Sequence, residues 1–377
     1  MTRQTFDYNA ADAQATPVEP VSPESFDFKA YEDYESSLLE KCSSFRNAES
    51  GVMVYRRMRV GEVYAGGCRD MRRSLELQLG ALKKSILFKA DIPNFIEPWY
   101  GIGTVASAFG IEYTWKENLA PAVKPPFRSV KDALDYPAVP VAGTPIGKHT
   151  VEMIDYFLDR TGGRLPMSST DSQSPLNIST YIVDISSFFM EMFDNPEGVK
   201  TLLDRVADLY IDFSHKQIEL IGEALVLPGH GFASCRCFEG MGFSDDNMLM
   251  LSGKHYLEFA TPALEKAGRD FGGIAFHSCG DWSDRIDTVK KIAGLHRIDG
   301  AFSPATDPSP NPPEPFSEAF VNTHIVVDAR IVGDPDDVAG VVKHLWKPGM
   351  KLVVVTYCQT PEEQAVAYER IHEICRI

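Results

Sequence analysis

The sequence predicts an α/β fold, a (β/α)8 TIM barrel with an N-terminal extension and loop insertions. Short apolar runs alternate with segments of helical period over about 320 residues, as in a parallel sheet with helical crossovers. The chain has 377 residues, which exceeds the roughly 250 of a typical barrel and leaves room for insertions. A doubly wound open sheet is the alternative, but no Gly-x-Gly-x-x-Gly follows a strand and opens a helix.

The strands of this pattern are short apolar or β-branched runs bounded by Gly, Pro, Asn or Asp. Pro93 weakens the second of them, because proline cannot donate to a ladder. The eight predicted strands cover residues 51–56, 91–97, 164–171, 223–228, 273–279, 298–303, 323–331 and 351–358.

Apolar residues at helical spacing predict the segments between the strands. Asn195-Pro196 and Thr360-Pro361 each combine an N-cap residue with proline at the first helical position. Irregular loops are expected over 116–145, 229–253 and 304–315, which are rich in proline or glycine. The predicted helices cover residues 26–48, 69–88, 105–109, 130–134, 149–161, 175–193, 196–222, 254–270, 283–293, 335–346 and a last segment from 361.

Two regions follow from this order. Residues 1–48 form a polar tail, to about residue 25, and a helical extension; residues 49–377 form the barrel. A hydrophobic content of 44% and a charged content of 24% are ordinary for a globular protein.

The net charge indicates what kind of molecule the protein binds, and the cysteines indicate its cellular compartment. The net charge of −16 argues against nucleic acid or an anionic membrane surface and suits small-molecule chemistry. Seven scattered cysteines, no secretory signal and no apolar run of membrane length indicate a cytoplasmic protein with reduced thiols.

Metal-ligand residues end two of the predicted strands. His277 and Cys279 lie two apart, so a strand would present both on one face. Cys358 closes the eighth strand, and strand ends of a barrel converge on one mouth. An imidazole and two thiolates with an open fourth position describe a catalytic zinc site.

Other readings of the cysteines remain. A single buried cysteine is more often core packing than a ligand. His230, Cys235 and Cys237 form a rival metal set in the loop after the fourth strand, although a glycine-rich loop holds ligands less rigidly. The remaining thiols, Cys42, Cys68 and Cys375, are interpreted as ordinary packing residues.

Substrate-binding residues are expected around the same mouth. Acidic and aromatic side chains near the strand ends are the candidates, to hold substrate or fill the fourth zinc position. They are Glu97, Asp171, Glu239, Asp281, Trp282 and Tyr357, with Trp99 as a further aromatic.

At these residues a resemblance becomes specific. His277-Ser278-Cys279-Gly280-Asp281, with Cys358 after a late strand, resembles the His-x-Cys…Cys zinc motif of the corrinoid-dependent methyltransferases in the uroporphyrinogen decarboxylase superfamily. The resemblance extends from about residue 50 onward. It implies a barrel in which His277, Cys279 and Cys358 are catalytic zinc ligands. The activity implied is methyl transfer between a methylated corrinoid protein and a small-molecule thiol.

Two other functions stay open. The decarboxylase branch of the superfamily is metal-independent and carries Arg-Gln-Ala-Gly-Arg after the first strand, where this chain reads Tyr55-Arg56-Arg57-Met58-Arg59. A non-catalytic carrier or sensor of a corrinoid or metal is the third reading, and no Asp-x-His-x-x-Gly corrinoid motif supports a built-in cofactor domain. The thiol, the original methyl donor, the fourth zinc ligand and the oligomeric state are not predicted.

Overall fold

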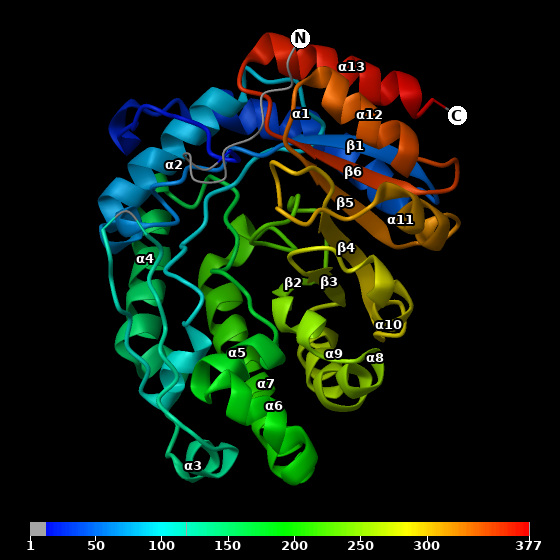
Figure 1. The fold of residues 1–377 in the computed structure, drawn as a ribbon. Coiled ribbons are helices and arrows are strands. Elements are labelled where there is room, and N and C mark those ends of the chain that lie inside the picture. The colour runs from blue at the N-terminus through cyan, green and yellow to red at the C-terminus, as the bar shows by residue number, and fades with distance from the viewer. Residues whose placement is uncertain (1–12, 118, 377) are drawn as a thin grey trace.

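The computed structural model describes residues 13–117 and 119–376, and a six-stranded parallel sheet forms its centre (Figure 1). The strands lie in the order β1-β6-β5-β4-β3-β2. Every neighbouring pair is parallel, so the carboxyl ends of all these strands lie at one edge. The strands are β1 Gly51–Arg56, β2 Met241–Ser244, β3 Ile274–His277, β4 Leu295–Ala301, β5 Val326–Ile331 and β6 Lys351–Thr356.

Extended segments continue the ring between the two edge strands. The Asp91 amide donates to Val54 of β1 at 2.8 Å. Met167 then bridges Ile96 on one side and Leu225 on the other, both in parallel. The Gly242 amide of β2 donates to Pro228 at 2.9 Å, which brings the ring back to the sheet. The α/β class is confirmed, and single bridges stand where regular ladders were predicted.

Prolines explain why three of the eight predicted strands are not regular. Residues 91–97, 164–171 and 223–228 contain Pro93, Pro166 and Pro228, and a proline has no amide hydrogen for a ladder. The other five predicted strands are observed as β1 and β3–β6. Strand β2 was not predicted, since it lies in the expected glycine-rich loop 229–253.

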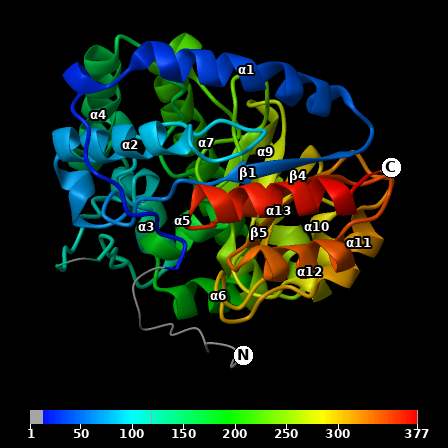
Figure 2. The same cartoon turned by 90° about the horizontal axis from the view of Figure 1, so that it is seen from above.

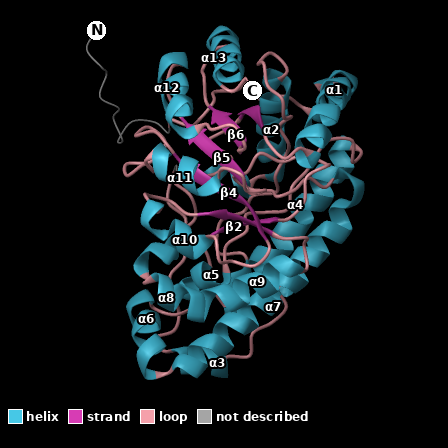
Figure 3. Ribbon diagram, turned by 90° about the vertical axis from the view of Figure 1, so that its right-hand side faces the viewer, coloured by secondary structure: helices cyan, strands magenta, loops and turns pink. Residues whose placement is uncertain are grey.

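Helices cover the outside of the strands (Figure 3). Helices α12 and α13 pack against each other, side by side in Figure 2, and the long helix α7 packs against α5 and α9. The helices are α1 Phe28–Asn47, α2 Met71–Ser85, α3 Val130–Asp135, α4 Pro145–Thr161, α5 Pro175–Ile182, α6 Ile185–Asp194, α7 Pro196–Ile221, α8 Gly253–His255, α9 Thr261–Arg269, α10 Ile286–Val289, α11 Pro313–Phe320, α12 Pro335–Leu345 and α13 Pro361–Ile374.

Two predicted helix starts are confirmed by their caps. The Asn195 side chain accepts from the Gly198 amide, and Pro196 begins α7. The Thr360 and Glu363 side chains form a reciprocal capping box at the start of α13. These residues end the preceding loops sharply, which is why the sequence located both helices.

Other helices differ from the prediction. The segment 175–193 is two helices, because the chain is extended at Val183 between α5 and α6. The segment 254–270 is α8, a π-helical turn over Tyr256–Ala260 and then α9. Helix α11 was not predicted; it begins at the end of the proline-rich loop, with a proline in its first turn.

Strand side chains alternate between an outer and an inner layer. Leu352 and Val354 of β6 join the large apolar core that includes residues of α12 and α13. Val353 and Val355 join an inner cluster with Met53 of β1. The sheet therefore separates the large outer core from this inner cluster.

Two buried ion pairs belong to the inner layer of β4 and β5. Arg297 Nη1 lies 3.1 Å from Asp328 Oδ1, and Arg330 Nε lies 2.8 Å from Asp299 Oδ1. All four side chains are buried. Buried charges are tolerated when they are paired in this way.

Helix α1 packs across the amino ends of the strands. Arg46 at its end pairs with Glu239, just before β2, at 2.6 Å, and its carbonyl accepts from Lys351, the first residue of β6. The predicted boundary between residues 1–48 and 49–377 stays a prediction, and residues 1–12 of the predicted tail lie outside the described residues. No helix among the described residues is long and apolar enough to cross a membrane.

Candidate active site

A cavity of about 270 Å³ opens where the strands end. Ser244 and His277 are the last residues of β2 and β3, and Arg57 directly follows β1. In a barrel this end carries the chemistry. The charged and aromatic side chains in the cavity wall are Arg57, Arg59, Tyr64, Trp99, Asp171, His230, Phe232, His277, Asp299 and Arg330.

Three possible metal ligands meet at one side of this cavity. His277 Nε2 lies 3.4 Å from Cys279 Sγ and 3.7 Å from Asp246 Oδ1. Asp246 is drawn in because its Oδ1 accepts a hydrogen bond from the Cys279 amide at 2.7 Å. The ligand atoms of these residues all lie within 4.8 Å of one another. The structure thus brings together the predicted pair, His277 and Cys279, and adds the carboxylate of Asp246 as a third possible ligand that was not predicted.

The imidazole of His277 is oriented from behind. Its Nδ1 lies 2.6 Å from Asp299 Oδ1, and Asp299 is in turn held by Arg330. Burial disfavours a charged imidazole, but the hydrogen bonds with Asp299 and Cys279 outweigh it and raise the pKa of His277 to about 10. Since Asp299 occupies Nδ1, Nε2 is the nitrogen that points to Cys279.

The donor set fits a zinc ion. Zinc bonds of about 2.0–2.3 Å at tetrahedral angles hold their ligand atoms roughly 3.3–3.8 Å apart. The 3.4 Å and 3.7 Å separations around His277 Nε2 lie in that range. A carboxylate on the second nitrogen of a ligating histidine is the usual outer partner. Three protein ligands leave a fourth position for substrate.

Cys358 is not part of this group. Within the described residues it belongs to neither of the clusters of possible metal ligands. Strand β6 ends at Thr356, whose hydroxyl donates to Gln364 of α13 at 2.8 Å, and Cys358 lies two residues beyond that end. Cys358 is buried, which raises the pKa of its thiol to about 11. The structure therefore does not bring Cys358 into this group, and its role as a ligand stays a prediction; Asp246 is the third possible ligand here.

A second polar cluster forms the opposite wall. His230 Nδ1 lies 2.6 Å from Glu97 Oε1, and His230 Nε2 lies 3.4 Å from Asp171 Oδ2. Trp99 Nε1 donates to Asp171 Oδ2 at 2.9 Å, and Tyr64 donates to Glu97 at 3.0 Å. Burial disfavours charge on the imidazole, but the neighbouring carboxylates Asp171 and Glu97 outweigh it and raise the pKa of His230. This wall places an imidazole of raised pKa between two carboxylates.

The rival metal set predicted from the loop is not assembled. His230 is engaged by Glu97 and Asp171, whereas Cys235 and Cys237 lie beside Cys42 of α1. The physical reason is a reversal of the chain: Cys235 pairs antiparallel with Leu227, which carries it back toward the amino ends. Cys42, interpreted as a packing residue, lies in this cluster.

Three predicted substrate-binding residues lie near the cavity. Asp171 lines it directly, and Glu97 is buried behind His230. Tyr357 is buried in the inner apolar cluster and is not part of the cavity wall. The binding role of each stays a prediction.

The other three lie elsewhere. Glu239 is at the amino end of β2, opposite the cavity, and pairs with Arg46. Asp281 is exposed and accepts from the Ser283 amide at 2.9 Å. Trp282 packs edge-on against Phe276 and Phe316 in the outer core. Proximity in sequence to a strand end did not place these side chains inside the mouth.

Several cavity residues were not predicted. Asp299 and Arg330 carried a signal, since a charge inside a β-branched, buried strand must find a partner. Arg57 and Arg59 alternate after β1, which is the period of one strand face. Asp246 carried no such signal in the sequence, because it follows β2, a strand that was not predicted.

Comparison with known proteins gives one family. The family model described as uroporphyrinogen decarboxylase (URO-D) matches residues 42–301, more than half of the chain. No curated protein matches. Among solved structures, a methyltransferase from Methanosarcina mazei is similar with a TM-score of 0.63 and 13% sequence identity, over 89% of this chain and 98% of that one. At this identity the similarity shows the fold.

Proposed function

The chain belongs to the uroporphyrinogen decarboxylase family, whose fold is a TIM barrel, and we propose that it is a zinc-dependent methyltransferase of that family. In this proposal a methyl group moves between a corrinoid on a partner protein and a small-molecule thiol. The observation that carries it is the group of His277, Cys279 and Asp246, in which His277 lines the cavity. The similar fold of the Methanosarcina mazei methyltransferase supports the methyltransferase part of this proposal.

His277, Cys279 and Asp246 would hold the zinc ion. When bound, zinc supplies a positive charge that keeps a substrate thiol as thiolate, whereas a free thiol with a pKa of about 8.5 is mostly protonated at neutral pH. Asp299 accepts from His277 Nδ1 and so fixes which nitrogen faces the ligand position. Arg330 holds Asp299 in turn. The chain's own contribution is therefore a rigid, preoriented donor set.

The rest of the cavity selects the thiol. Arg57 and Arg59 line the wall and favour a substrate that carries an anionic group. The volume of about 270 Å³ is below the roughly 300–1,000 Å³ of sites for drug-sized ligands. A compact, acidic thiol fits this site better than a large one.

The first prediction separates the observed ligands from the one expected from sequence. Cys279→Ser should lose about one zinc per chain and lower methyl transfer from methylcobalamin to a thiol by roughly 100-fold or more, because a ligand is removed. Cys358→Ser is the matched control and should keep both zinc and activity, since Cys358 lies outside this group of possible ligands. Metal content by atomic emission and the rate of thiol methylation are the measurements.

Two results would count against this assignment. Full zinc and activity in Cys279→Ser would remove the site from the mechanism. Loss of zinc in Cys358→Ser with Cys279→Ser unaffected would restore the ligand expected from the sequence.

Metal-independent decarboxylation is the second candidate. Arg57, Arg59 and Arg330 in one cavity wall, with Asp171 opposite, are groups that could bind and protonate an acidic substrate. Against it, a cavity of about 270 Å³ is small for a porphyrinogen. Turnover of uroporphyrinogen that persists after chelation would favour this function over methyl transfer.

A further inference from the structure

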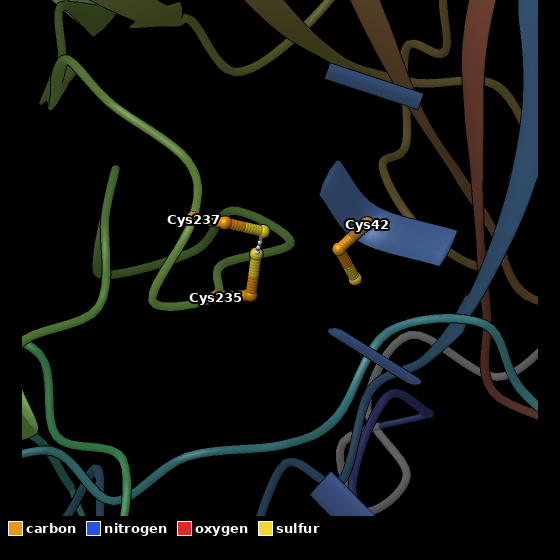
Figure 4. Close-up of side chains that lie close together, drawn as sticks. All are labelled: Cys42, Cys235 and Cys237. Carbon is orange, nitrogen blue, oxygen red and sulfur yellow. Dashed lines mark hydrogen bonds between the residues drawn. The ribbon is translucent and has the colours of Figure 1, made fainter. Parts of the chain in front are cut away.

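Three cysteines gather at the end of the barrel remote from the cavity. Cys42 comes from α1, whereas Cys235 and Cys237 come from the chain reversal before β2. Cys235 Sγ and Cys237 Sγ lie 3.0 Å apart, directed at each other with Cys42 beside them (Figure 4). The three sulfur atoms all lie within 4.8 Å of one another.

The surrounding structure holds the three thiols in place. Leu227 and Cys235 exchange backbone hydrogen bonds of 3.4 and 3.2 Å, which fix the reversal. Cys42 is anchored by α1, and its thiol donates to the Asp91 carbonyl at 3.4 Å. Apolar side chains of the inner cluster, Phe45 and Phe238 among them, enclose the group. Cys42 and Cys235 are fully buried and Cys237 is half-buried, which leaves one side open for entry.

We infer that Cys42, Cys235 and Cys237 bind a thiophilic d10 metal ion, Zn²⁺ or Cu⁺. Thiolate sulfur selects these ions, whereas carboxylate or amide ligands would suit Mg²⁺ or Ca²⁺. Metal–sulfur bonds of about 2.3 Å hold the sulfurs roughly 3.8–4.0 Å apart at tetrahedral or trigonal angles, so the Cys235–Cys237 pair opens by less than about 1 Å.

The position of the group assigns it a structural role. The amino-terminal face of a barrel contributes to stability, and the chemistry lies at the other end. One bound ion would link α1 to the reversal before β2, because Cys42 and Cys235 lie 193 positions apart in the sequence. This site is independent of His277 and Cys279, so it holds whether or not the proposed methyl transfer is correct.

A disulfide is the competing arrangement. Cys235 and Cys237 are close enough to be oxidised to one, with the two electrons passing to an external oxidant. Cys42 would then be left out as a lone thiol. The convergence of a third sulfur from another element favours the ion.

The test uses the full-length, reduced and metal-stripped protein titrated with Cd²⁺, which binds thiolates with an ultraviolet charge-transfer band for each Cd–S bond. The wild type should bind about two ions and show the band of four thiolates, three from this site and one from Cys279. Cys237→Ser should keep about a quarter of the band and Cys279→Ser about three quarters. Cys375→Ala removes a buried thiol outside both groups and should keep the whole band.

A second measurement does not depend on a variant that folds. In the wild type, Cd²⁺, Zn²⁺ or Cu⁺ should each protect Cys237 from iodoacetamide, and the tighter of the last two identifies the ion. Equal labelling with and without metal, or a band unchanged in Cys237→Ser, would overturn the inference. A Cys235–Cys237 cross-link that persists in the protein purified without reductant, with no metal bound, would overturn it in favour of the redox pair.

Discussion

At the scale of single residues, His277 shows how the site is preorganised. The ring is fixed through Nδ1 by Asp299, at 2.6 Å, and Asp299 is itself fixed by Arg330. Two buried charged side chains, Asp299 and Arg330, thus orient Nε2 of His277. Replacing a group that orients a metal ligand in this way can lower metal affinity about as much as replacing some of the ligands themselves.

Asp299→Asn should therefore weaken zinc binding at the cavity by about 10–100-fold, because the amide no longer holds the Nδ1 proton as strongly. The zinc concentration for half-maximal methyl transfer is the measurement. Asp328→Asn is the matched control, since it breaks the neighbouring buried pair with Arg297 and has no contact with His277. An equal loss in both variants would show that general destabilisation, not orientation, is responsible.

At the scale of elements, the second residue of β4, His296, packs against two glycines. A Cβ added at Gly240 would meet His296 Nε2 at 1.7 Å, and one at Gly273 would meet the same ring at 2.7 Å. Gly240 also has φ +82°, where other residues are strained. Burial, with Arg297 nearby, lowers the pKa of His296 to about 4. The imidazole is thus packed as a neutral ring.

This packing predicts a pH dependence of stability. The unfolded pKa of histidine is about 6.5. The stabilisation from neutral His296 is complete above that pH and is lost as the pH falls from 6.5 toward 4. A shift of this size corresponds to a loss on the order of 3 kcal/mol. The free energy of unfolding from urea titrations at pH 7 and pH 4.5 measures it.

His296→Leu should flatten that part of the profile, and His324→Leu, at an exposed position, should leave it unchanged. Identical profiles for wild type and His296→Leu would contradict the assignment.

At the scale of the molecule, the ring of strands has a strong arc and a weak arc. Strands β1–β6 are held by ladders of several residue pairs, whereas residues 91–97, 164–171 and 223–228 are held by single bridges. Local opening follows the number of hydrogen bonds that must break together. The cavity lies where both arcs meet, since His277 comes from the first and Asp171 from the second.

Backbone amides of the weak arc should exchange with deuterium earlier than those of β4–β6, by at least about tenfold in rate. Peptides that cover 91–97 and 351–356 provide the comparison in one experiment. Similar protection of the two peptides would show that the bridged segments open only with the whole barrel.

Much of this architecture followed from local pattern. The alternation located five regular strands, and the Asn195-Pro196 and Thr360-Pro361 pairs located two helix starts. Spacing also put His277 and Cys279 on one face. It could not say whether Cys358 meets this pair, because alternation relates residues within a strand and Cys358 follows the end of β6. The approach of Cys42 to Cys235, or of Asp246 to Cys279, depends on tertiary folding and left no local trace.

The two ion pairs inside the barrel have a consequence for how its strands find their alignment. The outward-facing Ile298 of β4 and Val327, Ala329 and Ile331 of β5 are apolar and would tolerate many alignments. A slip of one residue in either strand would turn its arginine and aspartate onto the apolar face. Their partners in the other strand would then be buried without an opposite charge, at a cost of several kcal/mol. The two buried aspartates and two buried arginines therefore specify a single register between β4 and β5.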